Sequence, residues 1–164
     1  EIAKEDIDEY KEVDSLITDN PNLAIYLNFA DCTPVILYDY KNNIGAISHA
    51  GWRGTVQKIA PLTVNKMVEV YNSNPKNIIA VIGPCISFPC FETSSEIVEK
   101  LSKTINNPKG LFDSRHADLK GINKQQLVEI GVEQIDVCPY CTVLDNDKFF
   151  SYRKENGTTS PISA

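Results

Sequence analysis

The sequence predicts a mixed α/β (α+β) domain in which mixed sheets are flanked by helices. Short apolar runs of strand length alternate with segments whose apolar residues recur at helical spacing. Turn-forming Asn, Pro and Gly residues separate these runs, and no internal repeat or low-complexity tract is present. Because 164 residues suit one hydrophobic core, we expect a single domain over residues 1–164.

Several runs have the length and apolar content of β-strands. The run LAIYLNFA is long and apolar enough to predict a buried strand. Two other runs flank the short turn Lys41-Asn42-Asn43, which predicts an antiparallel hairpin. The predicted strands are residues 14–18, 23–30, 35–39, 44–49, 77–82, 135–138 and 149–153.

Helices are predicted in three places. Apolar residues recur at helical spacing from Val56 to Tyr71, and Pro61 should kink or restart that helix. Thr93 and Glu96 have the spacing of a capping box before a second helix. The third helix covers residues 119–130 and should end at Gly131.

Composition excludes several classes of function. The net charge of −6 is poorly suited to gripping a phosphate backbone, so we expect no nucleic-acid partner. The sequence has no run of 18 apolar residues and no apolar segment in its acidic first residues, so we expect neither a membrane span nor a secretory signal. Five cysteines, an odd number, fit free thiols in a reducing compartment, which predicts a cytoplasmic protein.

Two residues have the chemistry of metal ligands and should meet at one end of the predicted hairpin. Cys32 precedes the first hairpin strand and His49 ends the second. A thiolate and an imidazole suit zinc, and a catalytic zinc usually has three protein ligands and an open position. The alternative is that Cys32 is a small buried apolar residue and that His49 is a hydrogen-bonded residue at a strand end.

Residues next to this pair could bind or activate a substrate. Gly51 and Gly54 would let backbone amides approach an anion at a helix start, and Arg53 could add a bidentate contact. The alternative for Arg53 is an exposed side chain paired with an acidic neighbour. Asp31 could orient His49 or act as a general base, or it could be a turn residue that satisfies backbone donors.

The remaining candidates have weaker signals. Cys138 and Cys141 form a C-x-x-C pair that could bind structural zinc with Cys85 and Cys90 or take part in redox exchange, or all four could be buried structural thiols. Arg153 could reach the active site or lie at the surface. His116, in a turn-rich region, is expected to be exposed to solvent.

Five segments resemble one known family in order along the chain: ADCTPVILYD, SHAGWRGT, IGPCIS with CFE, DLKGINKQQLVEIGV and FFSYRKENGTT. The family is the YfiH/YlmD-like family, also described as multicopper polyphenol oxidase or laccase-like, and it is related to human laccase domain-containing protein 1. The resemblance covers nearly the whole chain, from about Asp14 to about Thr159. It implies a YfiH-like fold of the cysteine-hydrolase type.

The resemblance also implies a metal site. The family's zinc ligands are His, Cys and His, and Cys32 and His49 match the second and third. The first histidine belongs to a motif close to Gln-Val-His-Gly that should precede Glu1, so we expect that this chain lacks an N-terminal segment of the family. The family usually continues with Thr-Gly-Arg near the end, whereas this chain has Thr158-Thr159-Ser160-Pro161.

The function implied by the resemblance is zinc-dependent phosphorolysis of purine nucleosides (adenosine, inosine and methylthioadenosine) together with deamination of adenosine. The partners would then be a small nucleoside and phosphate, and the oligomeric state stays open. Alternatives are a peptidoglycan-editing amidase that acts on UDP-MurNAc-L-Ser, a copper-dependent polyphenol oxidase, and a non-catalytic fragment. Two histidines are few for the several coppers of laccase chemistry.

Overall fold

The computed structural model describes residues 1–4 and 13–157. Its centre is a five-stranded mixed sheet with the strand order β1-β3-β2-β4-β5. The strands, in chain order, are β1 (Ser15–Thr18), β2 (Thr33–Asp39), β3 (Ile44–Ala50), β4 (Ile78–Ile82) and β5 (Gln134–Val137). All neighbouring pairs are antiparallel except β4 and β5, which are parallel. The predicted mixed α/β class is therefore confirmed.

The predicted hairpin is formed by β2 and β3. Inward-facing Val35 and Leu37 are fully buried, whereas Ile36 and Tyr38 on the opposite face are exposed, as the twofold period of a strand requires. The turn is closed by Asp39, whose carboxylate accepts hydrogen bonds from the backbone N–H groups of Lys41 at 2.9 Å and Asn42 at 3.2 Å.

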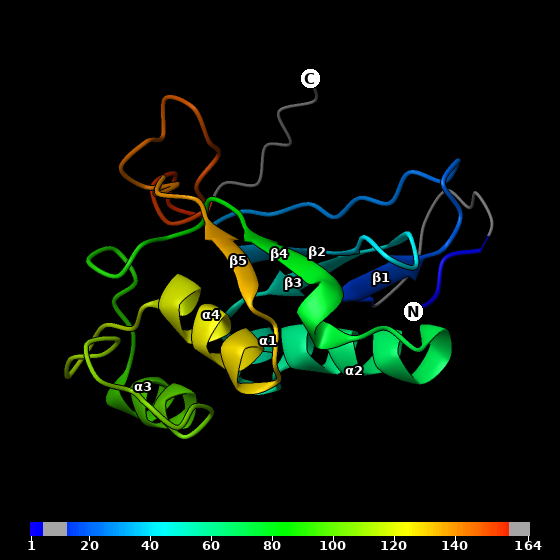
Figure 1. Cartoon of the computed structure of the whole chain (residues 1–164). Coiled ribbons are helices and arrows are strands. Elements are labelled where there is room, and N and C mark those ends of the chain that lie inside the picture. Colours follow the sequence, from blue (N-terminus) through cyan, green and yellow to red (C-terminus); the bar gives the residue numbers. More distant parts are fainter. Residues whose placement is uncertain (5–12, 158–164) are drawn as a thin grey trace.

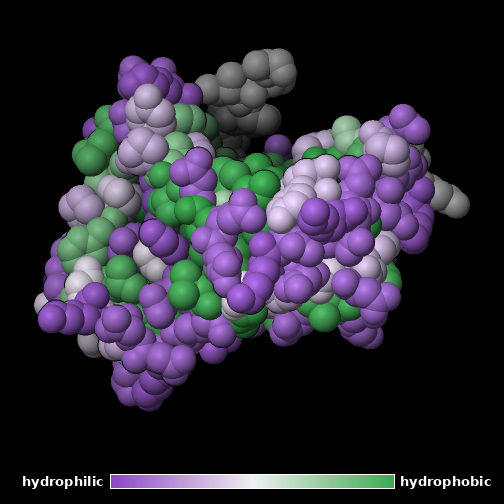
Figure 2. Space-filling model, viewed as in Figure 1, coloured by the Kyte–Doolittle hydropathy of each residue, from purple (hydrophilic) through white to green (hydrophobic). Residues whose placement is uncertain are grey.

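The helices lie on one side of the sheet (Figure 1). They are α1 (Trp52–Val56), α2 (Ile59–Tyr71), α3 (Ser95–Ser102) and α4 (Leu119–Glu129), and a 3-10 turn, η1 (Pro75–Asn77), precedes β4. In the same view, hydrophilic residues cover most of the surface over the helices, and hydrophobic residues reach the surface near β4 and β5 (Figure 2). None of the helices in the described part of the chain has the length and hydropathy that a bilayer span requires.

The helix predicted around Val56–Tyr71 is two helices. Lys58 adopts the left-handed conformation between α1 and α2, and Pro61 lies in the first turn of α2, where its missing N–H has no helical partner to lose. The predicted restart is confirmed. In α3 the cap is one residue later than predicted, because Ser94 Oγ, and not Thr93, accepts the hydrogen bond from Ile97 N.

Two predicted strands are absent. Residues 23–30 are outside any strand, and their side chains alternate between half-buried and exposed, with Tyr26 70% exposed. Their apolar content predicted a buried strand, but no neighbouring strand pairs with them within the described residues. Residues 149–153 also form no strand, because local bonds such as Glu155 N to Ser151 O (3.0 Å) fold this segment into turns.

Candidate functional site

The hairpin places Cys32 and His49 at its same end, as predicted. In the register of β2 and β3, Pro34 pairs with His49 and Thr33 pairs with Ala50. Cys32 immediately precedes β2 and, by extension of this register, lies opposite Gly51, two residues beyond His49. Diagonal positions of this kind lie about 7–8 Å apart, within reach of long side chains.

Two glycines allow the chain to fold tightly around this pair. A Cβ added at Gly51 would lie 2.7 Å from Cys32 Sγ, and a Cβ added at Gly54 would lie 2.8 Å from the carbonyl oxygen of His49. Real Cβ atoms do not approach so closely. Both glycines are thus needed for packing at the start of α1. Gly51 is the N-cap of this helix and provides no side-chain cap, which leaves the first amides of α1 without a side-chain partner.

Burial keeps both candidate ligands uncharged near neutral pH. Burial, followed by the charges of Asp31 and Asp14, raises the pKa of the Cys32 thiol. Burial also lowers the pKa of His49, and the charge of Asp14 opposes that effect only in part. A thiol and a neutral imidazole side by side can take up a cation once the thiol proton is released.

Aromatic and apolar side chains border the pair. The rings of Phe29 and His49 are 4.9 Å apart, centroid to centroid, and are tilted by 36°. A cavity of about 240 Å³ adjoins this end of the hairpin. It is lined in part by Leu27, Phe29, Asp31 and Phe150. Residues 23–30, predicted as a strand, thus contribute to the wall of the site.

Arg53 is exposed at the start of α1 and stacks on Trp52, with Cζ 4.4 Å from the ring centroid. No ion pair to Arg53 is found within residues 1–4 and 13–157. Among these residues, Arg53 therefore does not form the ion pair with an acidic neighbour that the sequence left open. Its guanidinium donors can contact a ligand.

Asp31 joins three loops. It has a left-handed backbone (φ 75°), and its two carboxylate oxygens accept hydrogen bonds from Thr142 Oγ1 (2.6 Å) and from Arg153 N (2.7 Å). Its carbonyl oxygen accepts a bond from Ile86 N (3.0 Å). Both carboxylate oxygens are thus used to fix loops, which is the structural role that the sequence offered as the alternative to a general base.

Arg153 uses its side chain to bind another loop. Nη1 donates to Cys90 O and Nη2 donates to Glu92 O, both at 3.2 Å. The predicted contact of this side chain with substrate stays a prediction. His116 is half-buried, not exposed, and its Nδ1 lies 3.0 Å from Asp113 Oδ1.

The described residues fit a metal ion only in part. No group of three or more His, Cys, Asp or Glu side chains that could hold a metal occurs within the ranges that the structure describes. Cys32 and His49 are two donors, and a catalytic zinc usually needs three. Within the same ranges, no structural zinc site is formed by the other four cysteines, which are Cys85, Cys90, Cys138 and Cys141.

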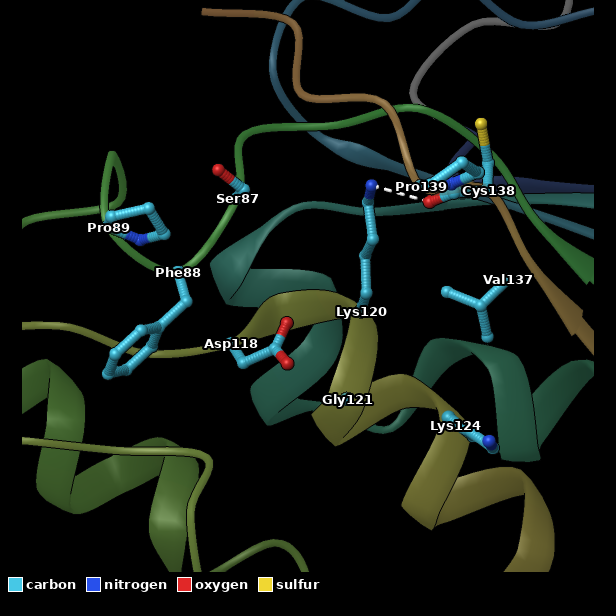
Figure 3. A pocket seen from close by; sticks show the side chains of 10 residues that line it. All are labelled: Ser87, Phe88, Pro89, Asp118, Lys120, Gly121, Lys124, Val137, Cys138 and Pro139. Carbon is cyan, nitrogen blue, oxygen red and sulfur yellow. Dashed lines mark hydrogen bonds between the residues drawn. The ribbon is translucent and has the colours of Figure 1, made fainter. Parts of the chain in front are cut away.

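One feature of the site region had no signal in the sequence. Lys120, in the first turn of α4, is only 8% exposed, and its Nζ donates to Cys138 O (2.7 Å) and Tyr140 O (2.5 Å). Figure 3 shows this lysine between the segment of Ser87 and that of Cys138, at a cavity of about 400 Å³. A lysine in a helix is usually exposed. The burial of Lys120 depends on two loop carbonyls whose positions are set by the fold, so the sequence did not indicate it.

Comparison with known proteins identifies the family. Residues 1–162 match the family model described as "Multi-copper polyphenol oxidoreductase laccase". The chain is 36% identical over 150 residues to a purine nucleoside phosphorylase of Bacteroides thetaiotaomicron. This match covers 87% of this chain and 56% of that protein. It is 33% identical over 156 residues to purine nucleoside phosphorylase YlmD of Bacillus subtilis (91% and 56%). It is 36% identical over 163 residues to adenosine deaminase RL5 of an unknown prokaryote (91% and 61%).

A solved structure has the same fold. The crystal structure of YlmD from Geobacillus stearothermophilus superposes with a TM-score of 0.85 at 33% identity, over 90% of this chain and 58% of that chain. This chain thus spans a little more than half the length of the relatives that it matches. On these matches, the chain belongs to the laccase-like YfiH/YlmD family.

Proposed function

We propose that this chain carries part of the active site of a zinc-dependent purine nucleoside phosphorylase that also deaminates adenosine. The observation that carries the proposal is the placement of Cys32 and His49 at the same end of the β2–β3 hairpin. The names of the relatives support the reaction class, since two of them are purine nucleoside phosphorylases and one is an adenosine deaminase.

The metal would be held by Cys32, His49 and a third donor from outside the described residues. Zinc, when bound, supplies Lewis acidity toward phosphate or water. Arg53, which has no ion pair among the described residues and lies next to the uncapped start of α1, would bind the phosphate through its guanidinium. Phe29, whose ring contacts His49, would exclude water and stack on the purine.

Asp31 has a positioning role in this proposal. Its bonds to Thr142 and Arg153 hold the loop that carries Cys32. The five free thiols fit a reducing compartment, which supports a cytoplasmic location.

The reaction is tested by incubation of the whole, zinc-loaded protein with adenosine and phosphate. Adenine with ribose 1-phosphate is the expected product of phosphorolysis, and inosine is the expected product of deamination. The Arg53→Met variant should lose phosphorolysis mainly through a higher KM for phosphate, while deamination, which needs no phosphate, should persist. If the zinc-loaded wild type yields none of these products, the proposal is wrong.

The metal site is tested by analysis of bound metal in Cys32→Ala, with Cys138→Ala as the control. Cys138 also lies in a loop, but its sulfur points away from the neighbouring Lys120 (Figure 3). We expect Cys32→Ala to lose zinc and Cys138→Ala to keep it. Zinc at the wild-type ratio in Cys32→Ala would exclude this thiol as a ligand, and copper in place of zinc would revise the metal.

A further inference from the structure

Lys120 lies in the first turn of α4 and has a buried side chain. It is only 8% exposed, and no carboxylate of residues 1–4 and 13–157 forms an ion pair with its Nζ. Nζ instead donates to Cys138 O at 2.7 Å, the bond drawn in Figure 3, and to Tyr140 O at 2.5 Å. An ammonium that is withdrawn from water must be compensated by such contacts, and hydrogen bonds from a charged donor are about twice as strong as neutral ones. Lys120 therefore binds the loop after β5 strongly.

The loop after β5, residues 138–142, is attached at both ends to the neighbouring chain. Its first residue is bonded to β4, since Cys138 N donates to Ile82 O at 2.8 Å. Its last residue is bonded to the segment after β4, since Thr142 N donates to Cys85 O at 3.1 Å. The middle of the loop therefore needs other contacts if its path is to be fixed between these two bonds.

Lys120 supplies those contacts to the middle of the loop. Pro139 has no N–H to donate, and Tyr140 N has no hydrogen-bond partner among the described residues. The next bonded amide is that of Cys141, which donates to Asp145 Oδ2 at 2.9 Å. Within the described part of the chain, the main-chain hydrogen bonds of residues 139 and 140 are thus reduced to the bond that Tyr140 O accepts from Lys120.

Thr142, at the end of the loop, holds the residue that precedes Cys32. Its Oγ1 donates to Asp31 Oδ1 at 2.6 Å, and both residues are buried. Asp31 has a φ of 75°, a left-handed conformation that a residue other than glycine keeps when its surroundings impose it. Bonds from Arg153 N and Ile86 N complete those surroundings. The direction in which the chain enters β2 with Cys32 therefore depends on where Thr142 lies.

We propose that Lys120 is a positioning residue for Cys32. The ammonium holds the carbonyls of residues 138 and 140, the loop places Thr142, and Thr142 fixes Asp31 next to Cys32. Without the ammonium, two carbonyls at a buried place lose their donor, so the loop moves toward water and Thr142 withdraws from Asp31. This inference rests on the proposed function only where it treats Cys32 as a metal ligand.

The test measures how fast iodoacetamide alkylates the Cys32 thiol in the whole, reduced and zinc-free protein. No Lys or Arg lies between Lys11 and Lys41, so the tryptic peptide that ends at Lys41 carries Cys32 and no other cysteine. Lys120→Met keeps the length of the side chain and removes its donors. We expect it to raise the rate by about tenfold, the factor for one lost hydrogen bond to a charged group. Lys124→Met, at an exposed position of the same helix, should keep the wild-type rate.

Two further variants separate positioning from a general loss of stability. Asp39→Asn weakens the fold at the far end of β2 and should leave the Cys32 rate unchanged, because the unfolded fraction stays small. Thr142→Val should raise the rate as Lys120→Met does, and the double variant should be no faster than the faster single one, since both act through one loop. If circular dichroism shows that Lys120→Met is unfolded, Lys120→Gln, which keeps a neutral donor, replaces it with a smaller expected increase.

Zinc affinity, measured by competition with a chelator, is the second readout. Lys120→Met should weaken it by about 10–100-fold, as the loss of support for a ligand does, whereas Lys124→Met should not. If the wild type binds no zinc, the proposed function fails, and the alkylation rates alone decide the role of Lys120. The inference is overturned if Lys120→Met keeps the wild-type alkylation rate or the wild-type zinc affinity, if Lys124→Met or Asp39→Asn matches it, or if the effects of Lys120→Met and Thr142→Val multiply.

Discussion

At the scale of single residues, two glycines determine where the candidate ligands lie. The sequence predicted Gly51 and Gly54 as residues whose amides approach an anion. The structure adds a steric reason for each, because Gly51 contacts the Cys32 sulfur and Gly54 contacts the His49 carbonyl. This role was not predictable from the sequence, since it depends on the register between β2 and β3.

Substitution of Gly51 by alanine should displace the Cys32 thiol. The new Cβ would lie 2.7 Å from Sγ, so the thiol must rotate away. Because a misplaced ligand or its support typically costs about 10–100-fold in metal affinity, we expect zinc retention to fall by about that factor, as measured by competition with a chelator.

Gly45→Ala is the matched control, since a Cβ at Gly45 meets no atom within 4 Å. This variant should bind zinc as the wild type does. Equal zinc affinity in Gly51→Ala and Gly45→Ala would show that the contact between Gly51 and Cys32 does not position the ligand.

At the scale of elements, the turn of the β2–β3 hairpin depends on one buried carboxylate. Burial alone would raise the pKa of Asp39, but the neighbouring Ser73 hydroxyl and the hydrogen bonds from Asn42 and Lys41 outweigh it and lower the pKa. The folded state therefore binds this proton less readily than the unfolded state. The stability that Asp39 contributes is present above the unfolded pKa of about 3.9 and is lost as the pH falls through the lowered folded pKa.

Asp39→Asn should therefore destabilise the protein at pH 7 and have less effect in acid. An asparagine NH₂ would face the Nδ2 donor of Asn42, which now bonds to Asp39 Oδ2 at 2.9 Å. We expect a loss of about 1–3 kcal/mol at neutral pH, measured by urea unfolding of both proteins across the acidic range. A difference in unfolding free energy that stays constant down to pH 2 would contradict the linkage.

Helix α1, which begins beside the candidate site, is held to α4 by buried polar groups. Thr55 Oγ1 donates to Ala50 O (3.2 Å) and accepts from Asn123 Nδ2 (3.0 Å), while Gln126 Nε2 donates to Thr55 O (2.9 Å). Removal of one partner leaves buried groups without hydrogen bonds.

Thr55→Val keeps the shape of the side chain and removes its hydroxyl. We expect the free energy of unfolding to fall by about 1–3 kcal/mol, as measured by chemical denaturation. Thr93→Val, at a partly exposed position outside the helices, serves as the comparison. Equal stability of the two variants would mean that the network does not hold α1.

The elements show how far the sequence determines the fold. The hairpin, β4, β5, α4 and a helix restart near Pro61 were predictable, because local periodicity and turn residues specify them. Residues 23–30 have the apolar content of a strand but lack a paired neighbour among the described residues, and no local pattern reveals a missing neighbour. The shared position of Cys32 and His49 at one end of the hairpin was predictable, whereas the burial of Lys120 depends on long-range packing.

At the scale of the whole molecule, the helices cover one face of the sheet and leave apolar side chains on the other. Ile36 and Val81 are cross-strand partners, as are Tyr38 and Ile79, and all four are 36–45% exposed. These four side chains form a contiguous apolar surface on the side of the sheet that the helices leave open.

The isolated chain should therefore bind a hydrophobic dye such as ANS in its folded state. Replacement of Ile36 and Val81 together by threonine should reduce the fluorescence by about half, because two of the four side chains are changed and β-propensity is retained. Leu62→Thr, which alters an exposed apolar residue of α2, should change it little. Unchanged dye binding in the double variant would place the apolar surface elsewhere.

The parallel pairing of β4 with β5 also sets an order of assembly. The β2–β3 hairpin closes over a few residues, whereas β5 reaches β4 only after residues 83–133 have been accommodated. Loop-closure entropy makes the distant pairing the slower step of folding. During synthesis, Cys32 and His49 would thus be neighbours before β5 leaves the ribosome.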